Sequence, residues 1–342
     1  SVGEARVAVA LIPHYLDGEA VVLCIARLRF NCPLCNKLLK KARKTDLPGH
    51  CRQPISTVVC RPLTPARHQP LLPDTVLSIY CLKGDPAAID IDINGFIGNW
   101  EDDGYCFLFF RQPADGIIEN LVGGNPDIRL EDQFEMTYRE WQGGFEGPVK
   151  IGRFLLTPPW LKKVPADDEI SLRFDPGLVF GNGTHPTTLA CLTAIEIACA
   201  GGKVERLLDL GTGTGLLALA GASLGCRQVL AVDNNMLAAA TAAVNIRINN
   251  LEQQVLAVNG RAQSFAELPS DLLVANIGYP VLKDLLSADH LRHHRWLVLS
   301  GLQNKEAEKI IKILAELDVV VLKQWQSDSL WNTVLAITAG GR

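Results

Sequence analysis

The sequence contains no long hydrophobic run, and this absence narrows the classes of protein it can encode. No apolar stretch approaches the roughly 20 residues that a bilayer-spanning helix needs, so we expect no membrane contact. The first apolar segment is interrupted by His14, Asp17 and Glu19, which makes it a poor signal peptide. With 48% hydrophobic and 20% charged residues, the composition is ordinary for a soluble globular protein. We therefore expect a cytoplasmic location.

The length and the distribution of charge indicate more than one domain. A chain of 342 residues can form two or three domains with separate cores. The net charge of −4 is uneven, because residues 1–74 hold eleven Lys and Arg against five Asp and Glu, which leaves −10 on the remainder. The two parts are expected to face different partners or each other.

Residues 1–74 form a basic extension, rich in cysteine and proline, with no assigned role. Five of the ten cysteines fall in the first sixty residues, which in a cytoplasmic chain favours reduced thiols or a metal over disulfides. The side chains whose spacing is compatible with tetrahedral zinc are Cys32, Cys35, His50, Cys51 and Cys60. A second CxxC or HxxxH pair is lacking, so ordinary reduced cysteines are the alternative and no metal site is assigned. The stretch KLLKKARK suggests a weak contact with RNA or with an acidic protein face.

The rest of the chain divides into a small domain, a linker and a larger domain. Residues 75–145 predict a small α+β domain, because TVLSIYCLKG and DGYCFLFFRQP are rich in β-branched and aromatic residues and end in glycine or proline. Residues 146–169 are expected to be a linker. From 170 to 342, short apolar strands alternate with helix-length segments, which predicts a doubly wound α/β sheet. DVVVLKQW and NTVLAITA predict a final antiparallel hairpin.

A glycine-rich loop, LLDLGTGTGLLALA, joins a predicted strand to a predicted helix at residues 207–220. In a doubly wound sheet, this is where a ligand can approach the backbone closely. A dinucleotide fingerprint requires Gly or Ala at its sixth position, but that position is Leu216. The GxGxG spacing is instead similar to the motif of class I S-adenosylmethionine-dependent methyltransferases. Its glycines are Gly211, Gly213 and Gly215.

Two carboxylates accompany this loop. Asp233 ends the next predicted strand, where a carboxylate can accept hydrogen bonds from both ribose hydroxyls. Asp209 precedes the glycines and is placed to face the ammonium of the methionine part; a helix-capping or loop-bracing role is the alternative. Together, the loop and its acids predict a nucleoside site for S-adenosylmethionine.

The segment DPGLVFGNGTHPTT, residues 175–188, resembles the DPGxAFGTGTHPTT segment of the ribosomal protein L-eleven methyltransferase (PrmA) family. The resemblance continues through LLDLGTGTG, AVDNN, DLLVANI, LVLSGL and Trp331. It covers residues 135–338 well and 75–134 loosely, and residues 1–74 have no counterpart. It implies a seven-stranded Rossmann-like methyltransferase sheet with a smaller α+β N-terminal domain that holds the substrate.

The resemblance also implies which residues contact the cofactor. Thr188 lies in the first turn of a helix that begins near Pro186, where free N–H groups and a hydroxyl can meet a ligand. Phe180 is either an apolar lid or a core residue, and a turn or capping role is favoured over catalysis for His185. The contacts that the resemblance implies are Thr188, Gly211, Asp233 and Asn276. The full set of candidate cofactor-binding residues is Phe180, Thr184, Thr188, Asp209, Gly211, Gly213, Gly215, Asp233 and Asn276.

Asn276 and Tyr279 are the candidates for orienting the amine that receives the methyl group. The family's usual ANIL pattern is ANIGYP here, which is faintly similar to the Asn-Pro-Pro-Tyr loop of methyltransferases acting on planar nitrogen atoms. The resemblance implies methylation of lysine side-chain or N-terminal amines of a large-subunit ribosomal protein. The alternatives are another protein lysine, a nitrogen of a nucleic acid or small molecule, and a non-enzymatic module associated with the ribosome or RNA.

Overall fold

The computed structural model describes residues 71–84, 95–102, 104–143, 147–161, 166–179, 181 and 183–338. It also describes the backbone of a two-residue strand pair, β1 (Tyr15–Leu16) and β2 (Glu19–Ala20). The other described strands form three sheets, of seven, four and three strands. The zinc candidates at Cys32, Cys35, His50, Cys51 and Cys60 and the stretch KLLKKARK lie outside the described residues.

The seven-stranded sheet confirms the predicted doubly wound architecture. Its order is β12-β11-β10-β13-β14-β16-β15, and β15 and β16 form the predicted antiparallel hairpin while the other five strands are parallel. Most strands are short apolar runs because helices cover both faces of the sheet. The bounds are β10 (Arg206–Leu210), β11 (Gln228–Asp233), β12 (Val255–Asn259), β13 (Ser270–Asn276), β14 (His294–Gln303), β15 (Val319–Ser327) and β16 (Trp331–Thr338).

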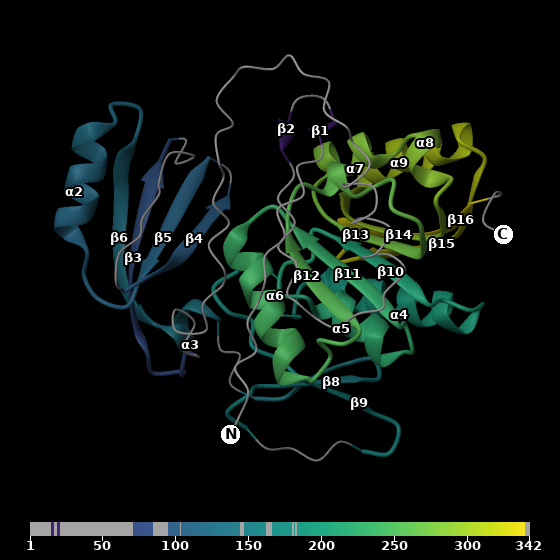
Figure 1. The fold of residues 1–342 in the computed structure, drawn as a ribbon, viewed down its shortest axis with the longest axis horizontal. Helices are drawn as coiled ribbons and strands as arrows, with labels where there is room; N and C mark the ends of the chain where they lie inside the picture. The colour runs from purple at the N-terminus through teal and green to yellow at the C-terminus, as the bar shows by residue number, and fades with distance from the viewer. Residues whose placement is uncertain are drawn as a thin grey trace, which may run out of the picture.

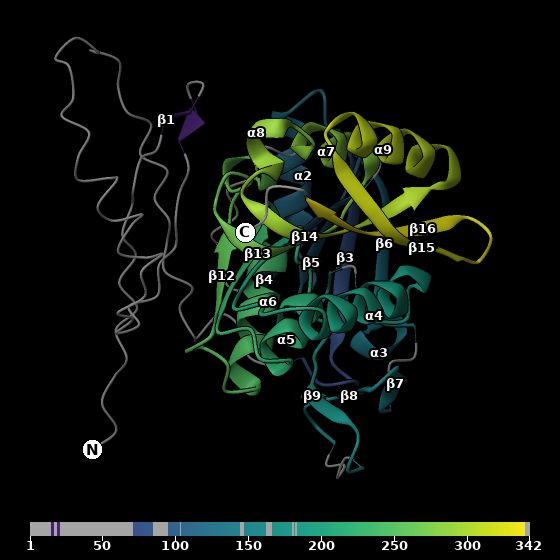
Figure 2. The same cartoon turned by 90° about the vertical axis from the view of Figure 1, so that its right-hand side faces the viewer.

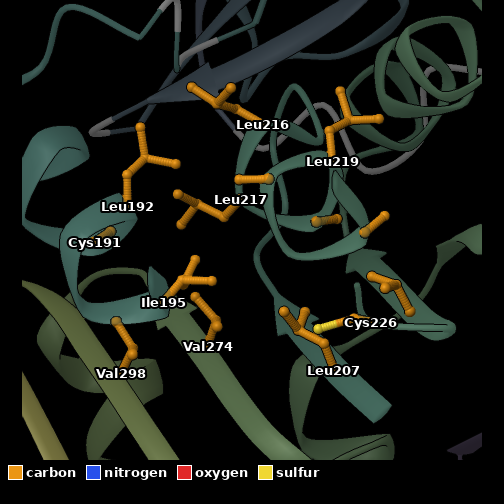
Figure 3. Packing of buried hydrophobic residues seen from close by; sticks show 14 of the residues in the cluster. Cys191, Leu192, Ile195, Leu207, Leu216, Leu217, Leu219, Cys226, Val274 and Val298 are labelled. Atoms are coloured by element: carbon orange, nitrogen blue, oxygen red, sulfur yellow. The ribbon is translucent and has the colours of Figure 1, made fainter. Parts of the chain in front are cut away.

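Helices pack on the two faces of this sheet in two separate cores. One face carries α4 (Pro186–Ala200), α5 (Leu216–Ser223) and α6 (Met236–Ile248). The other carries α7 (Tyr279–Leu285), α8 (Ala288–Leu291) and α9 (Asn304–Glu316), beside the short turn η1 (Ala262–Ser264). Figure 2 shows the two helix layers on opposite sides of the sheet. Figure 3 shows the first core, where Ile195 of α4 lies among Leu217, Val274 and Val298.

A three-stranded sheet lies outside the α4–α5 layer. It consists of β7 (Val149–Ile151), β8 (Phe154–Thr157) and β9 (Ile170–Arg173), in that order. Strands β7 and β8 fall within residues 146–169, the expected linker. Phe154 and Leu156 are fully buried against the core of the large sheet. Because this sheet covers its outer side, the leucines, alanines and glycine of α5 from Leu216 to Ala222 are all buried, and Ser223 at its end is exposed.

The small four-stranded sheet packs beside α6. Its strands are β3 (Val76–Lys83), β4 (Phe96–Asp102), β5 (Tyr105–Phe110) and β6 (Arg129–Thr137), in the antiparallel order β4-β5-β3-β6. One face holds α2 (Asp115–Gly124) through Tyr80, Leu108 and Ile118. The other face contacts Leu178 and Leu237 of the large unit, and α3 (Tyr138–Trp141) follows β6. Figure 1 shows α6 between the small sheet and the large one.

Candidate functional site

The site residues gather where the parallel strands end. Strand β10 lies between β11 and β13, and the chain fills one side of β10 before it crosses to the other. This reversal is the topological switch point at which open α/β sheets bind ligands. Asp209, Asp233 and Asn276 lie at or near the carboxyl ends of β10, β11 and β13.

The glycine loop turns sharply after β10. Gly211, Gly213 and Gly215 all have positive φ angles, of 74°, 56° and 84°. The N–H groups of Gly211 and Thr212 both donate to the carbonyl oxygen of Val232, at 2.8 and 2.9 Å. A Cβ on Gly211 would lie 2.0 Å from Cγ2 of Ile277. Only glycine lets this loop pass so close to the segment after β13.

Asp209 has one satisfied and one unsatisfied carboxylate oxygen. Its Oδ2 accepts a hydrogen bond of 2.6 Å from the Thr212 hydroxyl, whereas the buried Oδ1 has no partner. Burial raises the pKa of Asp209 to about 7; the Thr212 bond and the Ala218 N–H oppose this rise, and the charge of Asp233 adds to it. The Thr212 bond agrees with the loop-bracing role. The free oxygen additionally suits a cationic ligand group, because a buried acceptor without a partner is costly.

Asp233 is held rigidly between the glycine loop and the start of α6. Its Oδ2 accepts from the Gly213 N–H and its Oδ1 from the Asn235 N–H, both at 2.9 Å. Each carboxylate oxygen retains a further lone pair that a hydroxyl could use. The side chain is buried, and burial raises its pKa while these two backbone bonds lower it. The carboxylate is therefore oriented and can still accept from a ligand.

The two loops singled out by the sequence lie against each other. The Thr214 hydroxyl donates to the carbonyl oxygen of Gly181, at 2.9 Å. The buried side chain of Asn245, on α6, donates to the carbonyl oxygens of Asp175 and Thr214, at 2.7 and 2.9 Å. The loops at 175–188 and 211–215 thus form one hydrogen-bonded unit. Phe180 and Asn182 lie outside the described residues.

The first turn of α4 faces the end of β13. His185 caps the helix by accepting from the Thr187 N–H, which confirms the predicted capping role. Thr187 Oγ1 lies 2.8 Å from His185 Nδ1 and accepts from Asn276 Nδ2 at 3.3 Å. Because Nδ1 accepts the backbone bond, we assign the ring proton to Nε2. Thr188 is buried beside this turn, whereas Thr184 is exposed.

Trp331 contacts this group, and Tyr279 packs elsewhere. The Trp331 ring meets the His185 ring edge-to-face, with 5.1 Å between centroids. Tyr279 begins α7, is half-buried and packs on the core beneath α9. The Lys309 Nζ lies 5.4 Å from the centroid of its ring. Asn276 is thus joined to the α4 turn, and Tyr279 lies toward α9.

Sequence reasoning missed the buried polar residues that join the loops. Asn245 and Thr187 are fully buried, and Tyr138 donates from α3 to the carboxylate of Asp175. The one sequence signal was Asn245 itself, a polar residue inside the alanine-rich segment NMLAAATAAVNIRINN. A buried asparagine needs hydrogen-bond partners, so its position could have predicted a structural bridge.

The described part of the chain contains no group of three or more His, Cys, Asp or Glu side chains arranged to hold a metal ion. No helix in that part is long and apolar enough to cross a bilayer.

Comparison with known proteins gives the family. Residues 127–338 match the model of the ribosomal protein L11 methyltransferase (PrmA) family. The chain belongs to this family. The PrmA match begins within the small domain, just before β6, and runs to the end of β16. It includes every residue proposed from the sequence for the cofactor and the acceptor.

Individual PrmA relatives match over part of their length. The ribosomal protein L11 methyltransferase of Heliobacterium modesticaldum is 34% identical over 203 residues, which cover 58% of this chain and 63% of the relative. That of Desulforamulus reducens is 35% identical, over 56% of this chain and 63% of the relative. The chain thus spans less than two thirds of these relatives. A crystal structure of ribosomal protein L11 methylase from Lactobacillus delbrueckii subsp. bulgaricus, 28% identical, aligns with a TM-score of 0.49 over 56% of this chain and 99% of its own.

Proposed function

We propose that this protein is an S-adenosylmethionine-dependent N-methyltransferase that methylates lysine side-chain or N-terminal amines of a large-subunit ribosomal protein. The main support is the pair of buried carboxylates on either side of the glycine loop. Asp209 has an unpartnered oxygen, and Asp233 is held in place by two backbone N–H groups. A ligand with an ammonium group and a ribose complements both. Membership of the ribosomal protein L11 methyltransferase (PrmA) family supports this reaction and this acceptor. We propose that the acceptor would be met in the cytoplasm.

The chain's own residues would bind and align the reactants. S-adenosylmethionine supplies, when bound, a methyl group on a positively charged sulfur. Asp233 would accept from the ribose hydroxyls, and Asp209 would face the ammonium. The glycine loop would let the cofactor lie against the backbone, and Thr184 and Thr188 would also contact it. Transfer of this methyl group is an in-line displacement, which needs the donor and the acceptor to be aligned and water to be excluded. The adjoining loops can provide both.

The acceptor amine has to lose its proton before it can react. A lysine with a free pKa near 10.4 is neutral in only about one part in a thousand near neutral pH. Asn276 would orient the amine, and its bond to Thr187 at the end of β13 supports this role. Tyr279 is the second candidate, three residues further along the chain. Burial beside a cationic cofactor would lower the pKa of the amine.

The charge of the small domain supports a basic protein as acceptor. Residues 75–145 hold thirteen Asp and Glu against four Lys and Arg. Strand β6 lies at the edge of the small sheet, and Glu131, Asp132 and Glu135 are exposed along it. Ribosomal proteins contact RNA and are commonly basic, so an acidic face would attract them at long range.

Cofactor binding is the first test. Asp233→Ala should abolish binding of S-adenosylhomocysteine in calorimetry. Asp271→Ala is the matched control, because the Asp271 carboxylate also accepts two backbone N–H bonds, from Glu205 and Arg206, but at the opposite end of the strands. The control should bind like wild type. Binding by Asp233→Ala at wild-type affinity would overturn the ribose assignment.

Methyl transfer is the second test and separates the alternatives. The protein is incubated with isotope-labelled S-adenosylmethionine and either ribosomal protein L11 or a cell lysate. Label on L11 supports the proposal. Label on RNA or a metabolite would instead support the nitrogen acceptor suggested by the ANIGYP loop, and binding without any labelled product would support the non-enzymatic reading.

A further inference from the structure

Two side chains at α3, in the small domain, form hydrogen bonds with residues 175–177. This turn begins the loop at 175–188. Tyr138 is 1% exposed, and its hydroxyl donates to Oδ1 of Asp175. The same Oδ1 accepts from the Gly177 N–H at 3.1 Å. Gln142, just after α3, donates from its side chain to the carbonyl oxygen of Gly177. The turn at 175–177 is therefore held by side chains of the small domain.

Asn245 forms hydrogen bonds with both the turn at 175–177 and the glycine loop. Its Oδ1 accepts from the Asp175 N–H at 2.8 Å, and its Nδ2 donates to the carbonyl oxygens of Asp175 and Thr214. All the hydrogen-bonding groups of the amide are thereby used, with the side chain fully buried. Fully satisfied buried networks make a structure rigid. A displacement of Asp175 would consequently disturb Thr214.

The path ends at the groups proposed to hold the cofactor. Thr214 follows Gly213, whose N–H fixes Asp233, and its hydroxyl closes the unit by donating to Gly181. The small domain also contacts Asn235, whose N–H binds the other oxygen of Asp233: the Asn235 side chain donates to the carbonyl oxygen of Asn99 in β4, at 3.2 Å.

We propose that Tyr138 is a positioning residue that couples the docking of the small domain to the shape of the cofactor site, through Asp175, Asn245 and Thr214. This inference rests on the proposed function, because the affinity that Tyr138 would control is that of the proposed cofactor site. When the Tyr138–Asp175 bond is formed, both loops are fixed and the cofactor binds tightly. When the small domain shifts, as it would on engaging or releasing a protein acceptor, the loops loosen together. Cofactor exchange is thereby linked to the position of the domain that holds the acceptor.

The test compares two tyrosines in the full-length protein. Tyr80 is the matched control for Tyr138, because it is also fully buried in the small domain and its hydroxyl donates to a carboxylate, Asp115, at 3.0 Å. Tyr138→Phe and Tyr80→Phe both keep the ring and lose the hydroxyl. We expect Tyr138→Phe to weaken S-adenosylhomocysteine binding by about fivefold or more, the lower end of coupling between sites. Tyr80→Phe should bind like wild type even though it also loses a buried bond.

A ligand-free measurement separates this proposal from the proposed function. Hydrogen exchange of the Gly213 and Gly215 amides should be faster in Tyr138→Phe than in wild type and unchanged in Tyr80→Phe. If wild type failed to bind S-adenosylhomocysteine, the proposed function would fall, and the exchange data would still decide the coupling. Equal exchange in the two variants, or equal affinity where wild type binds, would overturn the role of Tyr138.

A double-mutant cycle locates the path. Asn245→Leu keeps a side chain of similar size but removes the bonds that join Asp175 to Thr214. If Tyr138 acts through Asn245, the combined variant should bind more tightly than the product of the two single effects predicts. Strict additivity would contradict the route through Asn245.

Discussion

At the scale of the residue, Asp209 is buried and one of its carboxylate oxygens lacks a hydrogen-bond donor. The carboxyl group is buried, one of its oxygens has no partner, and its pKa is raised to about 7. Without a cation nearby, the folded protein therefore takes up a proton there as the pH falls below 7. A ligand ammonium needs the ionised form, so binding and protonation compete.

This competition predicts how cofactor affinity depends on pH. Between pH 5.5 and 7, S-adenosylhomocysteine affinity should rise with pH, with a contribution from Asp209 of at most about tenfold per unit, and level off above about 7. Asp209→Asn should bind weakly and lose this contribution, as measured by calorimetry across the range. A slope as steep in the variant as in wild type would assign the proton to another group.

The raised pKa of Asp209 has a second consequence, for stability. The unfolded carboxyl ionises near its ordinary pKa of 3.8, whereas the folded one does so at about 7. Between these values the folded state holds the extra proton. The contribution of Asp209 to the free energy of unfolding therefore decreases as pH rises through this window.

At the scale of the element, the glycine loop depends on space as well as on backbone angle. Gly104, in the β4–β5 hairpin, has a φ of 78°, close to the 74° of Gly211, but nothing lies within 4 Å of its absent Cβ. Gly104→Ala should cost about 1–2 kcal/mol for the left-handed angle alone. Gly211→Ala should cost about 1–3 kcal/mol more, because its methyl group collides with Ile277. Urea unfolding of both variants measures the difference; equal losses would show that Ile277 moves aside without cost.

The elements of the seven-stranded sheet were predictable from the sequence, whereas β7 and β8, in the expected linker, and the contacts between elements were not. The parallel strands and the loop at 211–215 were predicted because apolar runs and glycine spacing are local signals. Tyr138 lies 37 residues from Asp175, and Asn99 lies 136 residues from Asn235. The periodicity of hydrophobic residues along the sequence gives no information about pairs so far apart. The sequence therefore identified the loops that form the site but not the side chains that hold them together.

At the scale of the whole molecule, the two units share one apolar interface. Leu237 at the start of α6 is buried against the small sheet, and a Cβ on Gly98 of β4 would lie 2.9 Å from its Cδ1. An apolar interface of this kind couples the unfolding of adjacent domains. We expect a single transition in wild type, with tryptophan fluorescence and far-ultraviolet circular dichroism coinciding.

Truncation of Leu237 should uncouple the two units. Leu237→Ala should lose about 2–5 kcal/mol of stability and separate the two transitions. Leu282→Ala is the control, because Leu282 is fully buried in the α7–α9 core of the large unit. It should lower the stability of the large unit by a similar amount without the same loss of coupling. Coincident transitions in Leu237→Ala would show that other contacts suffice.

The outer edge of β6 has a bearing on how the protein behaves when concentrated. Among the described residues, nothing pairs with the outer side of this nine-residue strand, and such an edge is a template for self-association. Glu131, Asp132 and Glu135 place like charges along that edge, so two copies repel each other before their backbones can pair. Glu131→Gln combined with Glu135→Gln should reduce this repulsion, and light scattering should then detect larger particles at a lower protein concentration than in wild type. An unchanged onset concentration would mean that some other surface keeps the copies apart.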